Sequence, residues 1–263
     1  MIGGLHKVEH TDIDLATRQS IERMKTGLDF GQWSVEEKVA LTCRMLAMEN
    51  HSETLAGQIT VRSTEGTFLT TPMAVGFDEI TTRDVIRINR DLEVLDSDRM
   101  ANPAVRFHTW IYDKRPDVNC IVHTHPPYVS ALSMIGKPLV VAHMDATPFA
   151  DDCAFLQEWP GLPIADDEGA VISAALGDKR SILLANHGFL TACSSVEEAA
   201  YLSLLIERAA RNQLVAMSAG TLKEVDPVLA RESHDFLLLP GVVKSSFAMF
   251  ARRALRHLGP VAP

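Results

Sequence analysis

Two short apolar runs that each end in a histidine and a chain breaker constrain the fold of this chain more than any other feature. The first occupies residues 119–127, Asn-Cys-Ile-Val-His-Thr-His-Pro-Pro, and carries His123 and His125. Alternate residues of a strand point to the same side, so these two imidazoles can face one point. Pro126 and Pro127 cannot extend a paired central strand, so the chain must turn directly after the second histidine.

The second run occupies residues 183–188, Leu-Leu-Ala-Asn-His-Gly, and carries His187. If the two runs form neighbouring strands of one sheet, the three imidazoles meet. Neutral imidazole binds zinc, manganese, iron or cobalt, and three protein ligands with an open position are typical of a catalytic metal site. A His-X-His pair alone is more often without a metal. The repeated pattern favours a divalent-metal site at His123, His125 and His187.

Composition and charge narrow the class of protein. The chain has 263 residues, 46% hydrophobic and 22% charged, with a formal net charge of −9. An acidic chain repels phosphate backbones and no long Lys/Arg run is present, so we expect no nucleic-acid partner.

The sequence shows no sign of export or membrane insertion. Residues 1–10 lack the apolar core of a signal peptide, and no stretch of apolar residues is long enough to span a membrane. We therefore expect a cytoplasmic protein with a small-molecule substrate. Its four scattered cysteines indicate buried free thiols.

Local signals predict helices and strands in mixed order. Ser34 and Glu37 form a capping box that opens a helix ending near Asn50. Alternation from residue 57 indicates a half-buried strand at 57–62, joined by a turn to a second strand at 67–70. We also expect helices at 11–25, 104–114 and 196–219, and strands at 84–89, 92–95, 140–141 and 181–185. This order favours a mixed or mainly antiparallel sheet flanked by helices.

The chain divides into three predicted parts. Residues 1–33 would hold a peripheral helix, and residues 34–220 a catalytic domain. Residues 221–263 form an extension in which 236–239 and 247–250 are too apolar to be exposed to water. We expect this extension to pack on the domain or on a neighbouring subunit.

Over about residues 35–218 the chain resembles the class II aldolase/adducin family. The resemblance implies a three-layer α/β/α fold with a mixed, mainly antiparallel central sheet. It also implies one divalent metal ion per subunit, held by His123, His125 and His187. Homotetramers with active sites at subunit boundaries are a further implication. The matching segments are Ala-Gly-Gln-Ile-Thr-Val-Arg at 56–62, Thr-Pro at 71–72, Phe-Asp-Glu-Ile-Thr at 77–81, Arg-Pro-Asp at 115–117, His-Thr-His at 123–125 and Asn-His-Gly at 186–188.

The sequence departs from the sugar-phosphate aldolases of that family where they bind phosphate. In place of their Asn, Thr-Gly and Ser-Ser elements stand Gln58, Met73-Ala74 and Asn102-Pro103. Proline has no amide hydrogen and methionine no hydroxyl, so a phosphate dianion would find few donors. We expect an unphosphorylated substrate, and a more apolar pocket bordered by Gln58 and Met73.

A second departure concerns proton transfer. The acidic residue that serves these aldolases as general base corresponds to Ala104. Glu53, His108 and His143 are the candidates to replace it, and Arg106 could hold a substrate carboxylate in a bidentate contact. Each also has a structural explanation, such as a hydrogen-bonded helix histidine at 108 or an arginine paired with a structural acid.

The predicted reaction follows from the metal and the missing base. A Lewis-acidic ion stabilises the enolate left when a carbon–carbon bond breaks. Decarboxylation needs no base to deprotonate a hydroxyl, so it is favoured. The resemblance implies a hydroxyaromatic carboxylic acid as one substrate class, because the family contains decarboxylases of such acids. Aldol cleavage of a hydroxy-carbonyl compound is an alternative. An iron(II)-dependent oxygenase and a non-enzymatic, adducin-like interaction module are two others.

Overall fold

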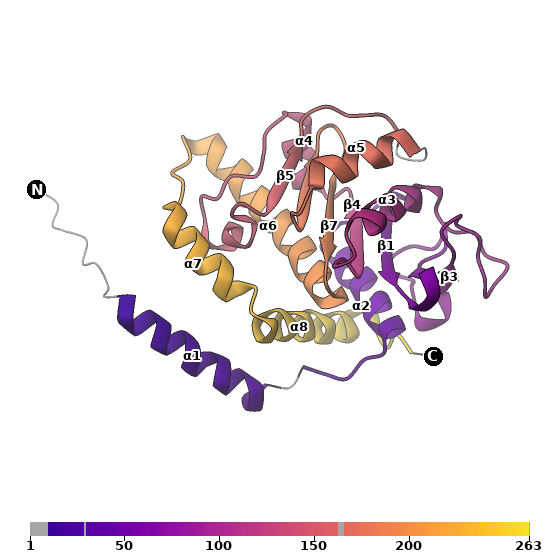
Figure 1. Cartoon of the computed structure of the whole chain (residues 1–263), viewed down its shortest axis with the longest axis horizontal. Helices are drawn as coiled ribbons and strands as arrows, with labels where there is room; N and C mark the ends of the chain where they lie inside the picture. The colour runs from indigo at the N-terminus through magenta and orange to yellow at the C-terminus, as the bar shows by residue number, and fades with distance from the viewer. Residues whose placement is uncertain (1–9, 29, 163–165, 263) are drawn as a thin grey trace, which may run out of the picture.

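A seven-stranded sheet lies at the centre of the protein (Figure 1). The computed structural model describes residues 10–28, 30–162 and 166–262. The strand order is β3-β2-β1-β4-β7-β6-β5, and neighbouring strands are antiparallel except for the parallel pair β5 and β6. The strands are β1 Gly57–Arg62, β2 Phe68–Thr70, β3 Ile86–Ile88, β4 Cys120–Thr124, β5 Cys153–Leu156, β6 Ser181–Leu184 and β7 Phe189–Cys193.

Helices cover both faces of this sheet. On one face, α3 and α5 pack over a core that includes Ile121 and Leu190. On the other face, α2, α4, α6 and α8 pack over Val122 and Phe189. The predicted three-layer α/β/α fold with a mixed, mainly antiparallel sheet is therefore confirmed. The helices are α1 His10–Gly27, α2 Val35–Met48, α3 Arg106–Lys114, α4 Pro127–Met134, α5 Asp166–Leu176, α6 Val196–Ala219, α7 Pro227–Leu237 and α8 Pro240–Leu258.

Several local predictions are confirmed. The Ser34 hydroxyl accepts from the Glu37 amide at 3.1 Å, and the Glu37 carboxylate accepts from the Ser34 amide at 2.7 Å. Strands β1 and β2 form the expected hairpin. The Asn102 side chain caps the short 3-10 turn Pro103–Val105 that leads into α3. Gly220 ends α6.

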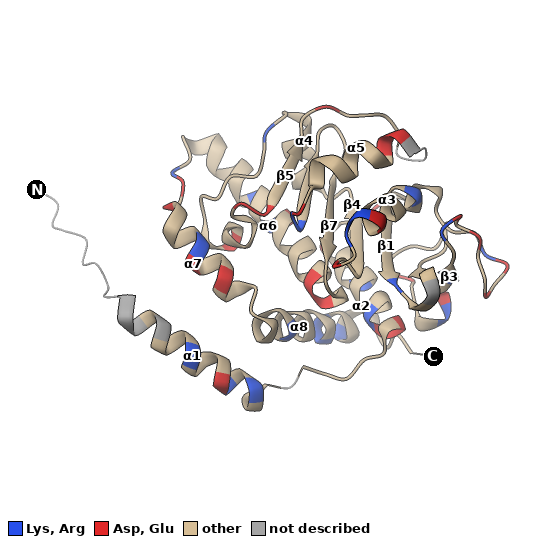
Figure 2. Cartoon of the chain, in the orientation of Figure 1, with Lys and Arg blue, Asp and Glu red and all other residues tan. Residues whose placement is uncertain are grey.

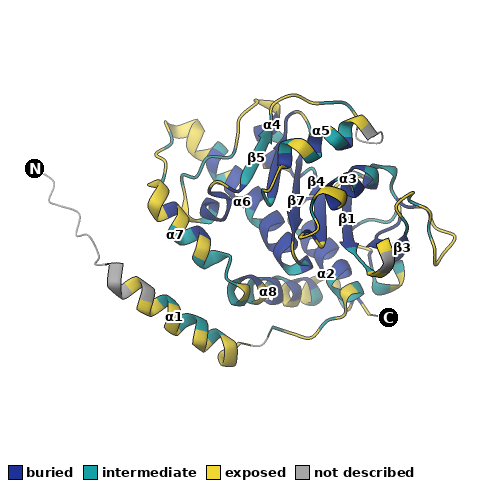
Figure 3. Cartoon of the chain, viewed as in Figure 1, coloured by how far each residue is buried: buried dark blue, intermediate teal, exposed yellow. Residues whose placement is uncertain are grey.

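Other local predictions are wrong. Strand β1 is buried at its four central positions instead of on one face, because helices lie above and below it (Figure 3). Residues 92–95 contribute only an isolated bridge between Ile88 and Val94. Residues 140–141 are not a strand, because the Val140 amide donates to the Gln213 side chain, not to the sheet. Strand β7 was not predicted.

The two ends of the chain differ in how closely they pack. Helix α1 lies apart from the body, beside α8 (Figure 1). Helix α8 packs against α2 and α6 and buries Phe247 completely. The division at residues 34 and 221, and any docking of the extension on a neighbouring subunit, stay predictions. Within the described residues, no helix has the length and apolar character needed to cross a membrane.

Candidate metal centre

Strand β4 places His123 in the middle of the sheet. The strand carries no charged residue, and its neighbours β1 and β7 hold it on both sides (Figure 2). In this register His123 lies opposite Gln58 on β1 and Leu190 on β7. Its Nδ1 lies 2.7 Å from the carbonyl oxygen of Phe189. A carbonyl only accepts, so Nδ1 carries the proton and the lone pair of the neutral ring is on Nε2.

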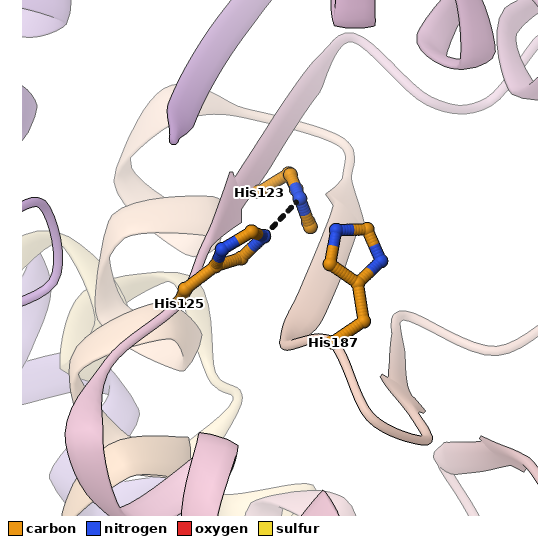
Figure 4. Close-up of side chains that lie close together, drawn as sticks. All are labelled: His123, His125 and His187. Atoms are coloured by element: carbon orange, nitrogen blue, oxygen red, sulfur yellow. Dashed lines mark hydrogen bonds between the residues drawn. The ribbon is translucent and has the colours of Figure 1, made fainter. Parts of the chain in front are cut away.

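The end of β4 brings His125 to the same point. Its Nε2 lies 3.0 Å from Nε2 of His123, and the two rings are inclined at 78° (Figure 4). Two ligand nitrogens at this separation can both reach one ion at the usual bond length of about 2.0–2.1 Å.

His187 completes the cluster from the turn between β6 and β7. Its ring centroid lies 4.8 Å from that of His123 and 4.5 Å from that of His125. One ligand atom from each of the three residues lies within 4.8 Å of the others. The turn is tight, with Asn186 in the left-handed region at φ 56°, a conformation that asparagine tolerates better than most residues.

The three imidazoles therefore converge, but by a different route from the one predicted. We expected the two histidine runs to be neighbouring strands. Instead β7 lies between β4 and β6, and the turn that starts β7 carries His187 back toward β4. The backbone carbonyl of Phe189 that orients His123 also comes from β7, and no side-chain pattern could have indicated it.

Electrostatics keep the cluster neutral. Burial lowers the pKa of all three histidines, and that of His187 falls to about 4. The neighbouring imidazoles lower the pKa of His123 further. Metal ligands must be unprotonated imidazoles, so these rings fit a divalent cation at neutral pH. Their assignment as metal ligands stays a prediction.

A cavity of about 610 Å³ opens onto the histidines. None of the described residues that line it is Lys, Arg, Asp or Glu. Its mouth carries the exposed side chains of Leu55, Met73 and Leu162. The remaining lining residues, apart from the histidines, are Thr54, Ala56, Gln58, Asn102, Pro103 and Ala104. The sequence singled out positions 58, 73 and 102–104 but not Leu55 or Leu162.

The predicted proton-transfer residues lie outside this lining. Glu53 is exposed on the loop after α2. His108 is completely buried, and its Nδ1 lies 2.9 Å from the hydroxyl of Thr60. His143 accepts at Nδ1 from the Asp145 amide at 3.1 Å. Their catalytic roles stay predictions.

Arg106 also lies outside the cavity lining. Its guanidinium donates to the carbonyl of Arg90 at 3.4 Å and lies 3.8 Å from a carboxylate oxygen of Asp91. These contacts match the structural explanation given above for an arginine in this helix. Substrate binding by Arg106 stays a prediction.

Comparisons with known proteins agree with this architecture. Residues 37–214 match the family model described as Class II Aldolase and Adducin N-terminal domain. Decarboxylase NovR of Streptomyces niveus is 35% identical over 181 residues, which cover 67% of each protein. The 4-hydroxy-3-prenylphenylpyruvate oxygenase/4-hydroxy-3-prenylbenzoate synthase of Streptomyces roseochromogenus subsp. oscitans is 35% identical, covering 67% of this chain and 65% of the relative. The solved L-fuculose 1-phosphate aldolase from Glaciozyma antarctica PI12 superposes with a TM-score of 0.76 at 28% identity, covering 84% and 88% of the two chains.

Proposed function

This chain belongs to the class II aldolase and adducin family, and on that premise we propose that it is a divalent-metal-dependent carbon–carbon lyase acting on an unphosphorylated hydroxy or oxo acid. Its relatives include a decarboxylase and aldolases, which support an enzyme of the lyase kind. Within that kind, we favour decarboxylation, including that of a hydroxyaromatic carboxylic acid. Aldol cleavage is the alternative lyase reaction.

His123, His125 and His187 are the residues that would hold the ion, with zinc or manganese favoured and iron or cobalt as alternatives. Such an ion supplies a Lewis acid that polarises the oxygen atoms of a bound acid and stabilises negative charge on them. The protein keeps the three imidazoles neutral by burial and fixes one of them through the Phe189 carbonyl. That hydrogen bond keeps the proton of His123 on Nδ1 and leaves the lone pair of Nε2 to bind the ion.

The cavity lining is the single observation that carries the proposal. No described residue that lines it is charged at neutral pH, so a phosphate dianion has no cationic side chain to pair with. Ala104 in the lining offers no proton acceptor beside the histidines. A reaction that begins without removal of a hydroxyl proton suits such a site better than aldol cleavage.

In a decarboxylation, the electron pair of the broken carbon–carbon bond stays on the substrate. Carbon dioxide leaves into the cavity, and a proton is then added to the carbon. Leu55, Met73 and Leu162 give the mouth of the cavity an apolar lining. Glu53, His108 and His143 remain the candidates for supplying the proton.

Elemental analysis combined with a substrate screen tests the proposal. The purified protein is dialysed, its metal content is measured, and it is then incubated with unphosphorylated hydroxy and oxo acids. Release of carbon dioxide from one acid by the metal-loaded protein, and not by the metal-free protein, is the expected result. Release of an aldehyde would favour the aldolase, and no product from any acid would reject the lyase.

A second candidate function is an iron(II)-dependent oxygenase. It is favoured by the three-imidazole cluster and by a relative at 35% identity whose name includes an oxygenase. Oxygen uptake that depends on added iron(II) and on one of the acids would identify it. The same acid converted without oxygen would exclude it.

Two further proposals concern the assembly and a non-enzymatic role. We propose a homotetramer with active sites at subunit boundaries, which light scattering tests, and a cytoplasmic location.

The non-enzymatic alternative, an adducin-like interaction module, needs no metal. The three converging histidines therefore argue against it, and a protein that retains no metal after dialysis would favour it.

A further inference from the structure

The side-chain amide of Gln58 has no hydrogen-bond partner among the described residues. Gln58 is 3% exposed, and its Oε1 is completely buried without a partner. The side chain lines the histidine cavity. Buried polar groups in folded proteins are nearly always hydrogen-bonded. Other buried atoms are also unpaired, at His51, His108, Ser130 and Glu168, but of these five side chains only Gln58 lines the histidine cavity, where a bound ligand can supply the partner.

The other neutral polar side chains of the lining are already in use by the backbone. Thr54 Oγ1 accepts from the Ala56 amide at 3.2 Å. Asn102 accepts from the Ala104 amide at 3.0 Å and donates to the Leu55 carbonyl at 3.2 Å. These bonds shape the loops around the cavity. Gln58 makes no such bond, so its polarity does not serve the local fold.

Thr60, two residues further along β1, shows the contrast on the same face of the strand. Its hydroxyl lies 2.9 Å from Nδ1 of His108 and 3.0 Å from the hydroxyl of Tyr112. A polar residue on this face can therefore be fully paired by α3. Gln58 lies beyond the reach of that network, at the cavity end of β1.

The register of the sheet places Gln58 beside the candidate metal centre. Gln58 and His123 are direct cross-strand partners on β1 and β4. Side chains of such partners point to the same face, with Cβ atoms about 4.5–5.5 Å apart. A ligand held at the histidines therefore lies within reach of the Gln58 amide.

From these observations we propose that Gln58 determines specificity by hydrogen-bonding a hydroxyl group at the acid end of the substrate. The inference rests on the proposed function, and it narrows the substrate to a hydroxy acid with an apolar body. A hydroxyl both donates and accepts, so it satisfies either end of the amide. The apolar body would lie against Leu55, Met73 and Leu162, since none of the lining residues that the structure describes carries a charge that could bind a second anionic group.

Gln58→Leu is the decisive variant, because leucine keeps the volume and removes the amide. The unliganded variant should melt at the same or a higher temperature than the wild type, since an unpaired buried group is lost. Thr60→Val is the matched control on the same strand face. It should melt at a lower temperature, because it leaves Nδ1 of His108 without a partner, while the Tyr112 hydroxyl keeps its bond to the Thr60 carbonyl.

Binding distinguishes a role in specificity from a structural role. Calorimetry with the zinc-loaded protein compares a hydroxy acid with its analogue lacking the hydroxyl. The wild type should prefer the hydroxy acid by roughly 10–100-fold, because a site with an unpaired polar group rejects an analogue that cannot pair it. Gln58→Leu should bind the two acids within about twofold of each other.

The possible failures are distinguishable. The inference is overturned if Gln58→Leu melts at as low a temperature as Thr60→Val. It is also overturned if Gln58→Leu still prefers the hydroxy acid as strongly as the wild type does. Both results leave the lyase proposal intact. If the preference depends on Gln58 but no acid is converted, the lyase proposal fails and the specificity assignment holds. A wild type that binds both acids equally, or neither, rejects the inference.

Discussion

Gly188 lies so close to His125 that no side chain fits between them. A Cβ at Gly188 would come within 2.6 Å of Cδ2 of His125 and within 2.4 Å of the carbonyl oxygen of Thr124. Both contacts are shorter than any that real Cβ atoms make. The glycine after His187 thus allows the β6–β7 turn to press against the end of β4, and this contact brings the third imidazole to the other two.

Replacing this glycine should damage the site more than the fold. In Gly188→Ala the turn must move away from β4, which separates His187 from the pair. We expect bound metal and activity to fall by at least about tenfold, as for changes next to metal ligands. Metal content and activity are measured together with the circular dichroism spectrum. Gly220→Ala is the matched control, because nothing lies within 4 Å of its Cβ position, and it should retain full metal and activity.

Removing a histidine tests the cluster directly. His123→Ala and His187→Ala should each lower metal affinity and activity by about 100-fold or more, because a lost ligand costs more than a lost supporting contact. The fold should persist, since the apolar side chains of the two cores are unchanged. His257→Ala on the exposed face of α8 is the control and should behave as the wild type. A fully active variant without bound metal would contradict the assignment.

The sequence contained enough to predict the strands of the site and the residues at their ends. His123, His125 and His187 follow apolar runs, and such runs form buried strands whether or not their neighbours are known. The order of the strands was not predictable in the same way. Strand β7, Phe189–Cys193, begins directly after the glycine of the turn, so no separate signal marks its start. The contact between Gly188 and His125 depends on this order and was therefore not predictable either.

The properties of single side chains were less predictable than their positions. Gln58 was expected at the pocket because it replaces a phosphate-binding residue, and it does line the cavity. Its lack of a partner depends on where α3 begins, because the helix pairs Thr60, and the segment before the helix lies beside Gln58 in the cavity lining. Histidine is a residue type that often transfers protons in enzymes, yet α3 buries His108 completely against Thr60. Sequence spacing gives the face of an element but not what covers it.

Buried histidines outside the cluster should make stability depend on pH. Burial lowers the pKa of His51 and His108 to about 3, below the value of about 6.5 in an unfolded chain. The unfolded state therefore binds more protons between these values. The free energy of unfolding should be highest above pH 6.5 and should fall as the pH drops toward 3, by up to about 1.4 kcal/mol per pH unit for each histidine.

Urea titrations between about pH 7 and pH 5 measure this slope. His51→Gln should make it shallower by up to about 1.4 kcal/mol per pH unit, because glutamine does not titrate. His257→Gln, at an exposed position, should leave the slope unchanged. Equal slopes in the wild type and in His51→Gln would contradict the burial effect.

Phosphate should bind this protein weakly, because no lysine or arginine is among the described residues that line the cavity. Competition calorimetry should show a sugar phosphate binding less tightly than an unphosphorylated hydroxy acid of similar size.

Adding one cation at the mouth of the cavity should strengthen the binding of phosphate. Leu162 lines the cavity and is 62% exposed, so Leu162→Lys should fold normally and bind phosphate roughly 2–5-fold more tightly, the effect of one exposed ion pair. Leu229→Lys is the control, since Leu229 is 54% exposed on α7 and does not line the cavity. Equal gains in both variants would trace the effect to net charge, and a wild type that prefers the sugar phosphate would refute an unphosphorylated substrate.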